Sequence, residues 1–191
     1  MPLCLSYIPI GLACGILLHA AGFSWINNYW CNLLNEKAMN GQLNAARPIA
    51  LFAMGVLSCS LALFWIIFPS FAEFNMRNGM VMKAAGILAM IFGMFSFTQY
   101  HDMVINLATF TGLIPVAFTL VGLYRAGWMK LYQGGLFILF LIVLNNILYY
   151  REGLLHFLPM IQKFTFLYFL SWICLINIRL YDIAVHRVTK I

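Results

Sequence analysis

The segment Leu131–Tyr150 reads LYQGGLFILFLIVLNNILYY and carries no Asp, Glu, Lys or Arg. A transmembrane α-helix needs about 20 consecutive, mainly apolar residues to cross the hydrocarbon core of a bilayer. A membrane β-strand would instead show about ten residues in which apolar and polar positions alternate. Because this segment is continuously apolar in its centre, it predicts a membrane-spanning helix.

Apolar runs of similar length lie on both sides of this segment. We expect them to form further spans at residues 3–24, 48–68, 80–98, 103–124 and 157–178. The predicted fold class is therefore all-α: a polytopic membrane helix bundle of about six transmembrane helices, in one domain covering residues 1–191. The first run has no basic segment before it, which favours a retained span over a cleaved signal peptide.

The composition agrees with a protein that is solvated mainly by lipid. Apolar residues make up 64% of the chain and charged residues 8%, whereas about 25% of residues are charged in a typical soluble domain. The formal net charge is +6, but the basic residues stand singly between apolar runs. Nucleic-acid binding is not expected, because no basic stretch interleaved with aromatic residues is present.

The basic residues also predict an orientation. In a six-span arrangement four of them fall on the side of the 25–47 connection, namely Lys37, Arg47, Arg151 and Lys163. The other side carries seven: Arg77, Lys83, Arg125, Lys130, Arg179, Arg187 and Lys190. The positive-inside rule then places both termini in the cytoplasm. We expect a multi-pass protein of the plasma (inner) membrane with the 25–47 connection outside.

The one long connection, residues 25–47, has the sequence WINNYWCNLLNEKAMNGQLNAAR. Trp25, Tyr29 and Trp30 are of the types that favour the headgroup layer. Together with Leu33 and Leu34 they present too much apolar surface to leave in water, so we expect this outer loop to lie against the bundle. It also contains Cys31, while the other four cysteines lie within apolar runs and no metal-binding spacing is present.

Polar residues cluster at the outer ends of the expected spans. The candidates for a cavity on the outer face are His19, His101, Asp102, Asn106, Asn145 and Asn146. Each would be costly against lipid, so we expect His19, His101, Asp102, Asn106 and at least one of the two amides of the fifth span to converge in the bundle. Purely structural roles stay open: a favourable carboxylate at a helix start for Asp102, and interhelical hydrogen bonds for the amides.

A second group of polar residues lies farther out and could contribute to the same face: Glu36, Arg47, Arg151, Glu152 and His156. Three histidines with an open position form a known catalytic zinc set. His19, His101, Asp102 and His156 are therefore weak candidates for a zinc site, and two of the histidines could bind haem. Lys163 is expected to reach towards the interface with its long side chain.

The six expected spans, the loop ending Asn44-Ala-Ala-Arg47-Pro48 and the Tyr100-His101-Asp102 junction resemble the DRAM-like six-helix membrane proteins and related bacterial families. This resemblance implies a six-helix fold and a link to membrane lipids, without a defined reaction. The chain is less similar to the ceramidase-like membrane hydrolases, because it lacks their paired HxxxH motif.

Three functional hypotheses follow. The first is binding of a membrane lipid or another amphiphile in a polar cavity at the outer face. The second is a metal-dependent membrane hydrolase acting on a lipid-like substrate, and the third is a haem-binding membrane electron carrier. A role as a homo-oligomer or as a subunit of a membrane complex is a further alternative.

Overall fold

A computed structural model describes residues 23–188, with side chains to residue 186. The expected first span and His19 lie outside the described residues. Within the described part the elements are, in chain order, η1 (Trp30–Leu34), α2 (Arg47–Phe71), α3 (Met76–Met94), η2 (Phe95–Phe97), α4 (His101–Arg125), α5 (Met129–Tyr150), η3 (Glu152–Phe157) and α6 (Leu158–Val188). The α elements are α-helices, and the η elements are short 3-10 helices.

The five long helices correspond to the last five expected spans, and by length and composition each could cross a membrane. Local sequence features explain where several of the helices begin and end. Pro48 stands in the first turn of α2, where a missing N–H costs nothing. The side chain of Asn75 accepts a hydrogen bond from the Asn78 N–H at 2.8 Å and caps α3. Helix α6 continues to Val188 instead of ending near residue 178, because neither Gly nor Pro follows Ile178.

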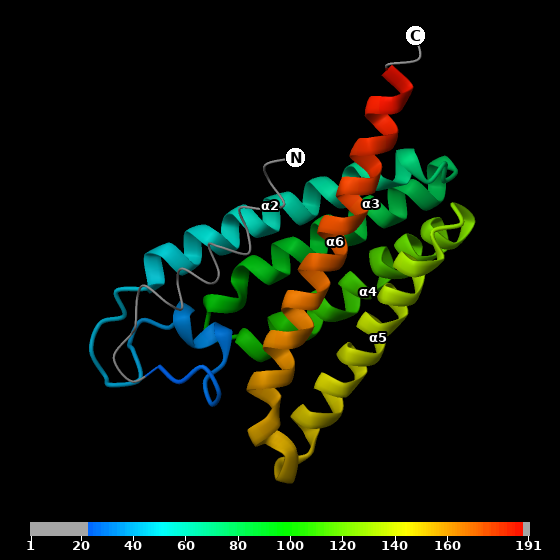
Figure 1. Ribbon diagram of the computed structural model, residues 1–191. Helices are drawn as coiled ribbons and strands as arrows, with labels where there is room; N and C mark the ends of the chain where they lie inside the picture. The colour runs from blue at the N-terminus through cyan, green and yellow to red at the C-terminus, as the bar shows by residue number, and fades with distance from the viewer. Residues whose placement is uncertain (1–22, 189–191) are drawn as a thin grey trace.

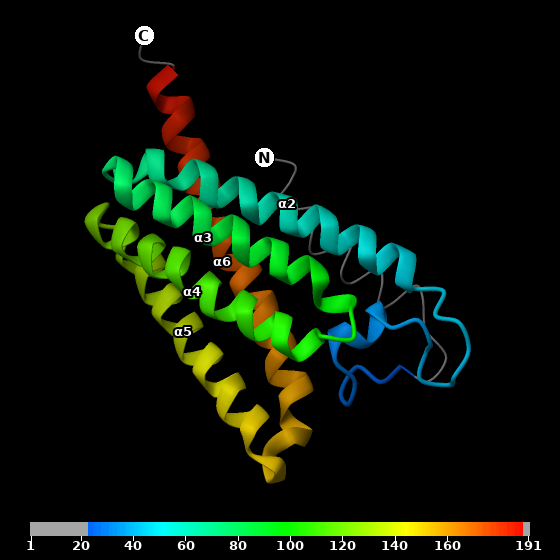
Figure 2. The same cartoon turned by 180° about the vertical axis from the view of Figure 1, so that it is seen from behind.

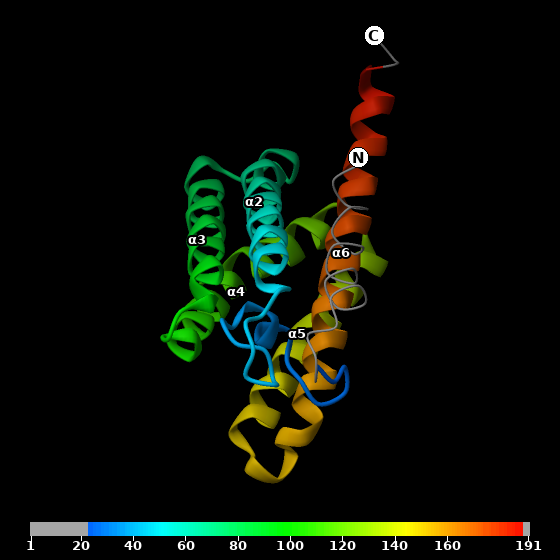
Figure 3. The same cartoon turned by 90° about the vertical axis from the view of Figure 1, so that its left-hand side faces the viewer.

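The helices form a bundle in which each runs antiparallel to the one before it. Helix α3 lies between α2 and α4, while α6 packs against α5. The end of the bundle that carries the 25–47 loop also carries η2 and η3, and we call it the loop end (Figures 1 and 2). Figure 3 shows α2 and α3 side by side, with α6 on the other side of the molecule.

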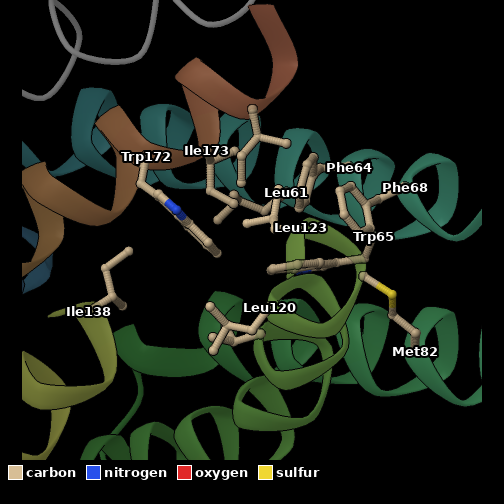
Figure 4. Close-up of a cluster of buried hydrophobic side chains, with 12 residues drawn as sticks. Leu61, Phe64, Trp65, Phe68, Met82, Leu120, Leu123, Ile138, Trp172 and Ile173 are labelled. Carbon is tan, nitrogen blue, oxygen red and sulfur yellow. The ribbon is translucent and has the colours of Figure 1, made fainter. Parts of the chain in front are cut away.

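All five helices contribute to one apolar core (Figure 4). Trp65 of α2 is 1% exposed and lies directly against Gly86 of α3, where no side chain intervenes. The indole of Trp172 on α6 donates a hydrogen bond to the Leu131 carbonyl of α5 at 2.7 Å. Outside this core, large apolar side chains such as Phe110 are widely exposed. Such a surface is suited to lipid and not to water.

The 25–47 loop, which we call the outer loop after its expected orientation, is ordered against the bundle, as the sequence predicts. Leu33 and Leu34 of η1 are buried in a second cluster with Ala46 and Ala50. The amide of Asn44 donates hydrogen bonds to the carbonyls of Leu33 and Asn35, each at 3.0 Å. These bonds satisfy backbone groups that an irregular loop would otherwise leave unpaired.

Candidate functional site

His101 and Asp102 begin α4 at the loop end, directly after the short connection from η2. Nδ1 of His101 and Oδ1 of Asp102 are 3.1 Å apart. The phenol of Tyr149, near the end of α5, lies within electrostatic range of the Asp102 carboxylate. The start of α4 and the end of α5 therefore lie close together at the loop end.

The outer loop adds a thiol to this pair. Helix η1 packs against η2, and this contact brings Cys31 to the start of α4. The Cys31 thiol lies close enough to the imidazole of His101 to interact with it electrostatically. Tyr29 lies two residues earlier, and burial raises the pKa of its phenol above the ordinary value. Cys31 and the His101–Asp102 pair thus lie at the same end of the bundle, although they come from two segments that are distant in sequence.

A groove of about 730 Å³ lies between α4 and α5. The two helices are joined at the far end and diverge towards the loop end (Figures 1 and 2). Most of the lining is apolar, with Phe110, Leu113 and Leu139 as examples. Asn106, Asn146 and Arg151 also line it. The groove is therefore apolar over most of its length and carries polar groups towards the loop end.

The two adjacent amides of α5 have different surroundings. Nδ2 of Asn145 donates to Oγ1 of Thr165 on α6 at 2.7 Å, so this side chain faces α6. Nδ2 of Asn146 donates to the Ile142 carbonyl of its own helix at 2.8 Å, and the side chain lines the groove. Of the five cavity candidates within the described residues, Asn106 and Asn146 line the groove, while His101, Asp102 and Asn145 do not.

The five outer contributors are divided between two places. Nη1 of Arg47 is 3.2 Å from Oε1 of Glu36, an ion pair that fastens the outer loop to the start of α2. Arg151 follows α5 and lines the groove. Glu152 and His156 lie on η3, and both are exposed. The ring centroids of His156 and Phe157 are 3.8 Å apart.

The metal hypothesis gains no geometric support from the described chain. Among residues 23–186, no group of three or more His, Cys, Asp or Glu side chains is arranged to hold a metal ion. His19 lies outside the described residues. Zinc binding and haem binding therefore stay predictions.

Sequence reasoning did not predict the surroundings of Cys31, Tyr149 and Lys163 at the loop end. The sequence distinguishes Cys31 only by its place in a polar stretch, and it gives no signal for Tyr149. Lys163 was expected to reach the interface in solvent, but it is 6% exposed. Its amine donates to the backbone carbonyls of Asn28 and Pro159. These contacts depend on how the outer loop folds back, which the sequence pattern does not encode locally.

The fold defines this chain as an α-helical, multi-pass membrane protein. No family model, curated protein or solved structure matches it. The resemblance to DRAM-like proteins accordingly stays a prediction.

Proposed function

We propose that this membrane protein binds a membrane lipid or a similar amphiphile in the groove between α4 and α5. The observation that carries this proposal is the division of the groove into an apolar part and a polar end. Its volume of about 730 Å³ lies within the usual range for ligand sites of roughly 300–1,000 Å³. An acyl chain suits the apolar part, which is lined by residues such as Phe110 and Leu139.

The polar end suits an anionic headgroup. Arg151 is the charged residue of the groove lining, and Asn106 and Asn146 add amide donors beside it. Guanidinium groups bind phosphate through two parallel hydrogen bonds. Asn106 is five residues after His101 on α4, about 8 Å along the helix axis. That depth fits the boundary between headgroup and acyl chain.

The groove also opens sideways to the expected bilayer. Phe110, Val143 and Ile147 line it and are 71%, 57% and 50% exposed. A lipid could therefore enter without leaving the membrane. With both termini in the cytoplasm of a plasma (inner) membrane protein, as the basic residues favour, the headgroup end would face the outside.

A photoreactive phospholipid tests the proposal. The protein is placed in nanodiscs that contain a trace of lipid with a diazirine in its acyl chain, and cross-links are located by mass spectrometry. We expect adducts to concentrate on groove residues of α4 and α5. Val143→Trp should reduce them by filling the groove, and Arg151→Gln by removing the headgroup contact.

Leu175→Trp is the matched control, because Leu175 is 56% exposed on α6 and does not line the groove. It should leave the groove adducts unchanged. Adducts spread evenly over all lipid-facing helices, with no response to Val143→Trp, would contradict the proposal.

A further inference from the structure

Two arginines lie over aromatic rings at the far end of the bundle, opposite the loop end. Cζ of Arg125, in the last turn of α4, is 5.8 Å from the centre of the Phe74 ring. Cζ of Arg179, on α6, is 5.9 Å from the ring centre of Trp128, which precedes α5. An aromatic face attracts a cation within about 6 Å of its centre. A ring therefore holds each guanidinium group in position.

The rings under the two arginines belong to one aromatic group. The centroids of the Phe71 and Trp128 rings are 5.7 Å apart. Phe74, three residues after Phe71, packs against Phe118 of α4 with 5.5 Å between ring centroids. The connection between α2 and α3 thus meets the connection between α4 and α5. The contact between these two connections brings Arg125 and Arg179 into the same part of the far end.

The N–H groups of both arginines are available to an external acceptor. Among the described side chains, neither arginine forms an ion pair with a carboxylate, and both are exposed. A guanidinium group has five N–H donors in a planar fork, and contact with an aromatic face uses none of them as a hydrogen bond. This fork matches the oxygen atoms of a phosphate group, which it binds through two parallel hydrogen bonds.

Positive charge prevails over negative charge at the far end. Besides the two arginines, the described part of this end carries three basic residues, Arg77, Lys83 and Lys130, and two acidic residues, Glu73 and Asp182. Five basic groups against two acidic ones attract anions to this surface. With both termini in the cytoplasm, as the basic residues favour, the far end faces the leaflet whose anionic lipids attract basic groups next to membrane helices.

We propose that Arg125 and Arg179 bind the phosphate groups of anionic phospholipids at the far end of the bundle. A lipid fits better than a soluble phosphate because apolar surface continues from the arginines towards the membrane. Val121, one turn before Arg125 on the same face of α4, is exposed, as is the neighbouring Tyr124. An acyl chain can cover these side chains while the phosphate meets the guanidinium groups. This site lies at the opposite end from the polar part of the α4–α5 groove and does not depend on it.

Two photoreactive lipids with different headgroups test the site. The full chain is placed in phosphatidylcholine nanodiscs that contain a trace of phosphatidylglycerol or phosphatidylcholine with a diazirine near the acyl carbonyl. Mass spectrometry then locates adducts on residues 71–77, 121–130 and 179–186. We expect the anionic probe to label these segments several-fold more than the zwitterionic probe.

Substitutions of the arginines separate this site from general surface charge. Arg125→Gln and Arg179→Gln should each reduce labelling by the anionic probe several-fold. Arg77→Gln is the matched control, because Arg77 is exposed at the same end and lies over no described ring; it should change labelling little. Arg125→Lys keeps the charge but loses the planar fork and should retain only part of the labelling. Helical circular dichroism checks that each variant is folded.

Three results would overturn the proposal. Equal labelling of the far end by the two probes would show that the headgroup charge is not recognised. A loss for Arg77→Gln as large as for the other two arginines, or full labelling of Arg125→Lys, would replace a defined site by general surface charge. Loss of labelling in excess glycerol phosphate, but not in chloride at the same ionic strength, would assign the arginines to a soluble phosphate. Persistent labelling in glycerol phosphate supports a lipid ligand.

Discussion

The amine of Lys163, on the second turn of α6, donates a hydrogen bond to the backbone carbonyl of Asn28 in the outer loop. The two residues are far apart in the chain, and their contact fastens the loop to the last helix. A hydrogen bond from a charged donor contributes about 1.5–3 kcal/mol, and Lys163 is only 6% exposed. The contact is therefore a main attachment of the loop.

Lys163→Met should release the outer loop while the helices stay formed. Methionine keeps most of the apolar stem but loses the donor, so the Asn28 carbonyl loses its partner. We expect trypsin to cleave after Lys37 at least several-fold faster in detergent, with little change in helical circular dichroism. Lys130→Met changes an exposed lysine of α5 and should not alter cleavage after Lys37. Equal cleavage of both variants and the parent protein would contradict the assignment.

Gly86→Ala should destabilise the bundle. A Cβ atom at this position would stand 2.5 Å from Cγ of Trp65, closer than atoms can pack. Helices α2 and α3 would have to separate, and overpacking of this kind costs about 1–3 kcal/mol. A lower midpoint of thermal unfolding in detergent measures the effect.

Gly93→Ala is the matched control on the same helix. A Cβ at Gly93 meets nothing within 4 Å, and alanine favours the helix by roughly 0.8–1.0 kcal/mol over glycine. We expect an unchanged or slightly higher midpoint. A similar loss of stability in both variants would show that the contact with Trp65 is not the cause.

The local signals in the sequence predict where the helices form, but not which helices and side chains pack against one another. An uncharged run of sufficient length predicts Leu131–Tyr150, and the structure has Met129–Tyr150, because backbone hydrogen bonding in lipid is satisfied within one segment. Leu33 and the aromatic residues of types that favour the headgroup layer, such as Trp30, predict an ordered outer loop. The rotation of a helix about its axis depends on packing, so Asn145 and Asn146 could not be assigned to different sides from sequence.

The proximity of Cys31 to His101 could not be predicted from the sequence either. It requires η1 to pack against η2, and neither segment carries a spacing that indicates the other. The short polar connection before α4 indicates His101 and Asp102 as candidates, but nothing in it connects them with one cysteine. Contacts between segments distant in sequence are decided by tertiary packing, which local periodicity does not report.

The orientation predicts the labelling of introduced cysteines. In a background without native cysteines, Leu43→Cys places a thiol in the outer loop, where Leu43 is 87% exposed. Met76→Cys places one at the far end, where Met76 is 82% exposed. An impermeant maleimide should label the first in intact cells and the second only after permeabilisation. The reverse pattern would invert the orientation that the basic residues favour.

The adjacent amides of α5 should respond differently to removal of their polar groups. Asn145 donates to Thr165 of α6 at 2.7 Å, an interhelical bond of a kind that contributes about 0.6–2 kcal/mol in membranes. The Asn146 amide donates only to its own helix among the described contacts, and it lines the groove.

Asn145→Leu should therefore lower the midpoint of thermal unfolding but leave the pattern of lipid cross-links unchanged. Asn146→Leu should leave the midpoint nearly unchanged and reduce cross-links near the headgroup end. A loss of stability for Asn146→Leu with no effect on cross-linking would assign that residue to packing and remove one support of the lipid site.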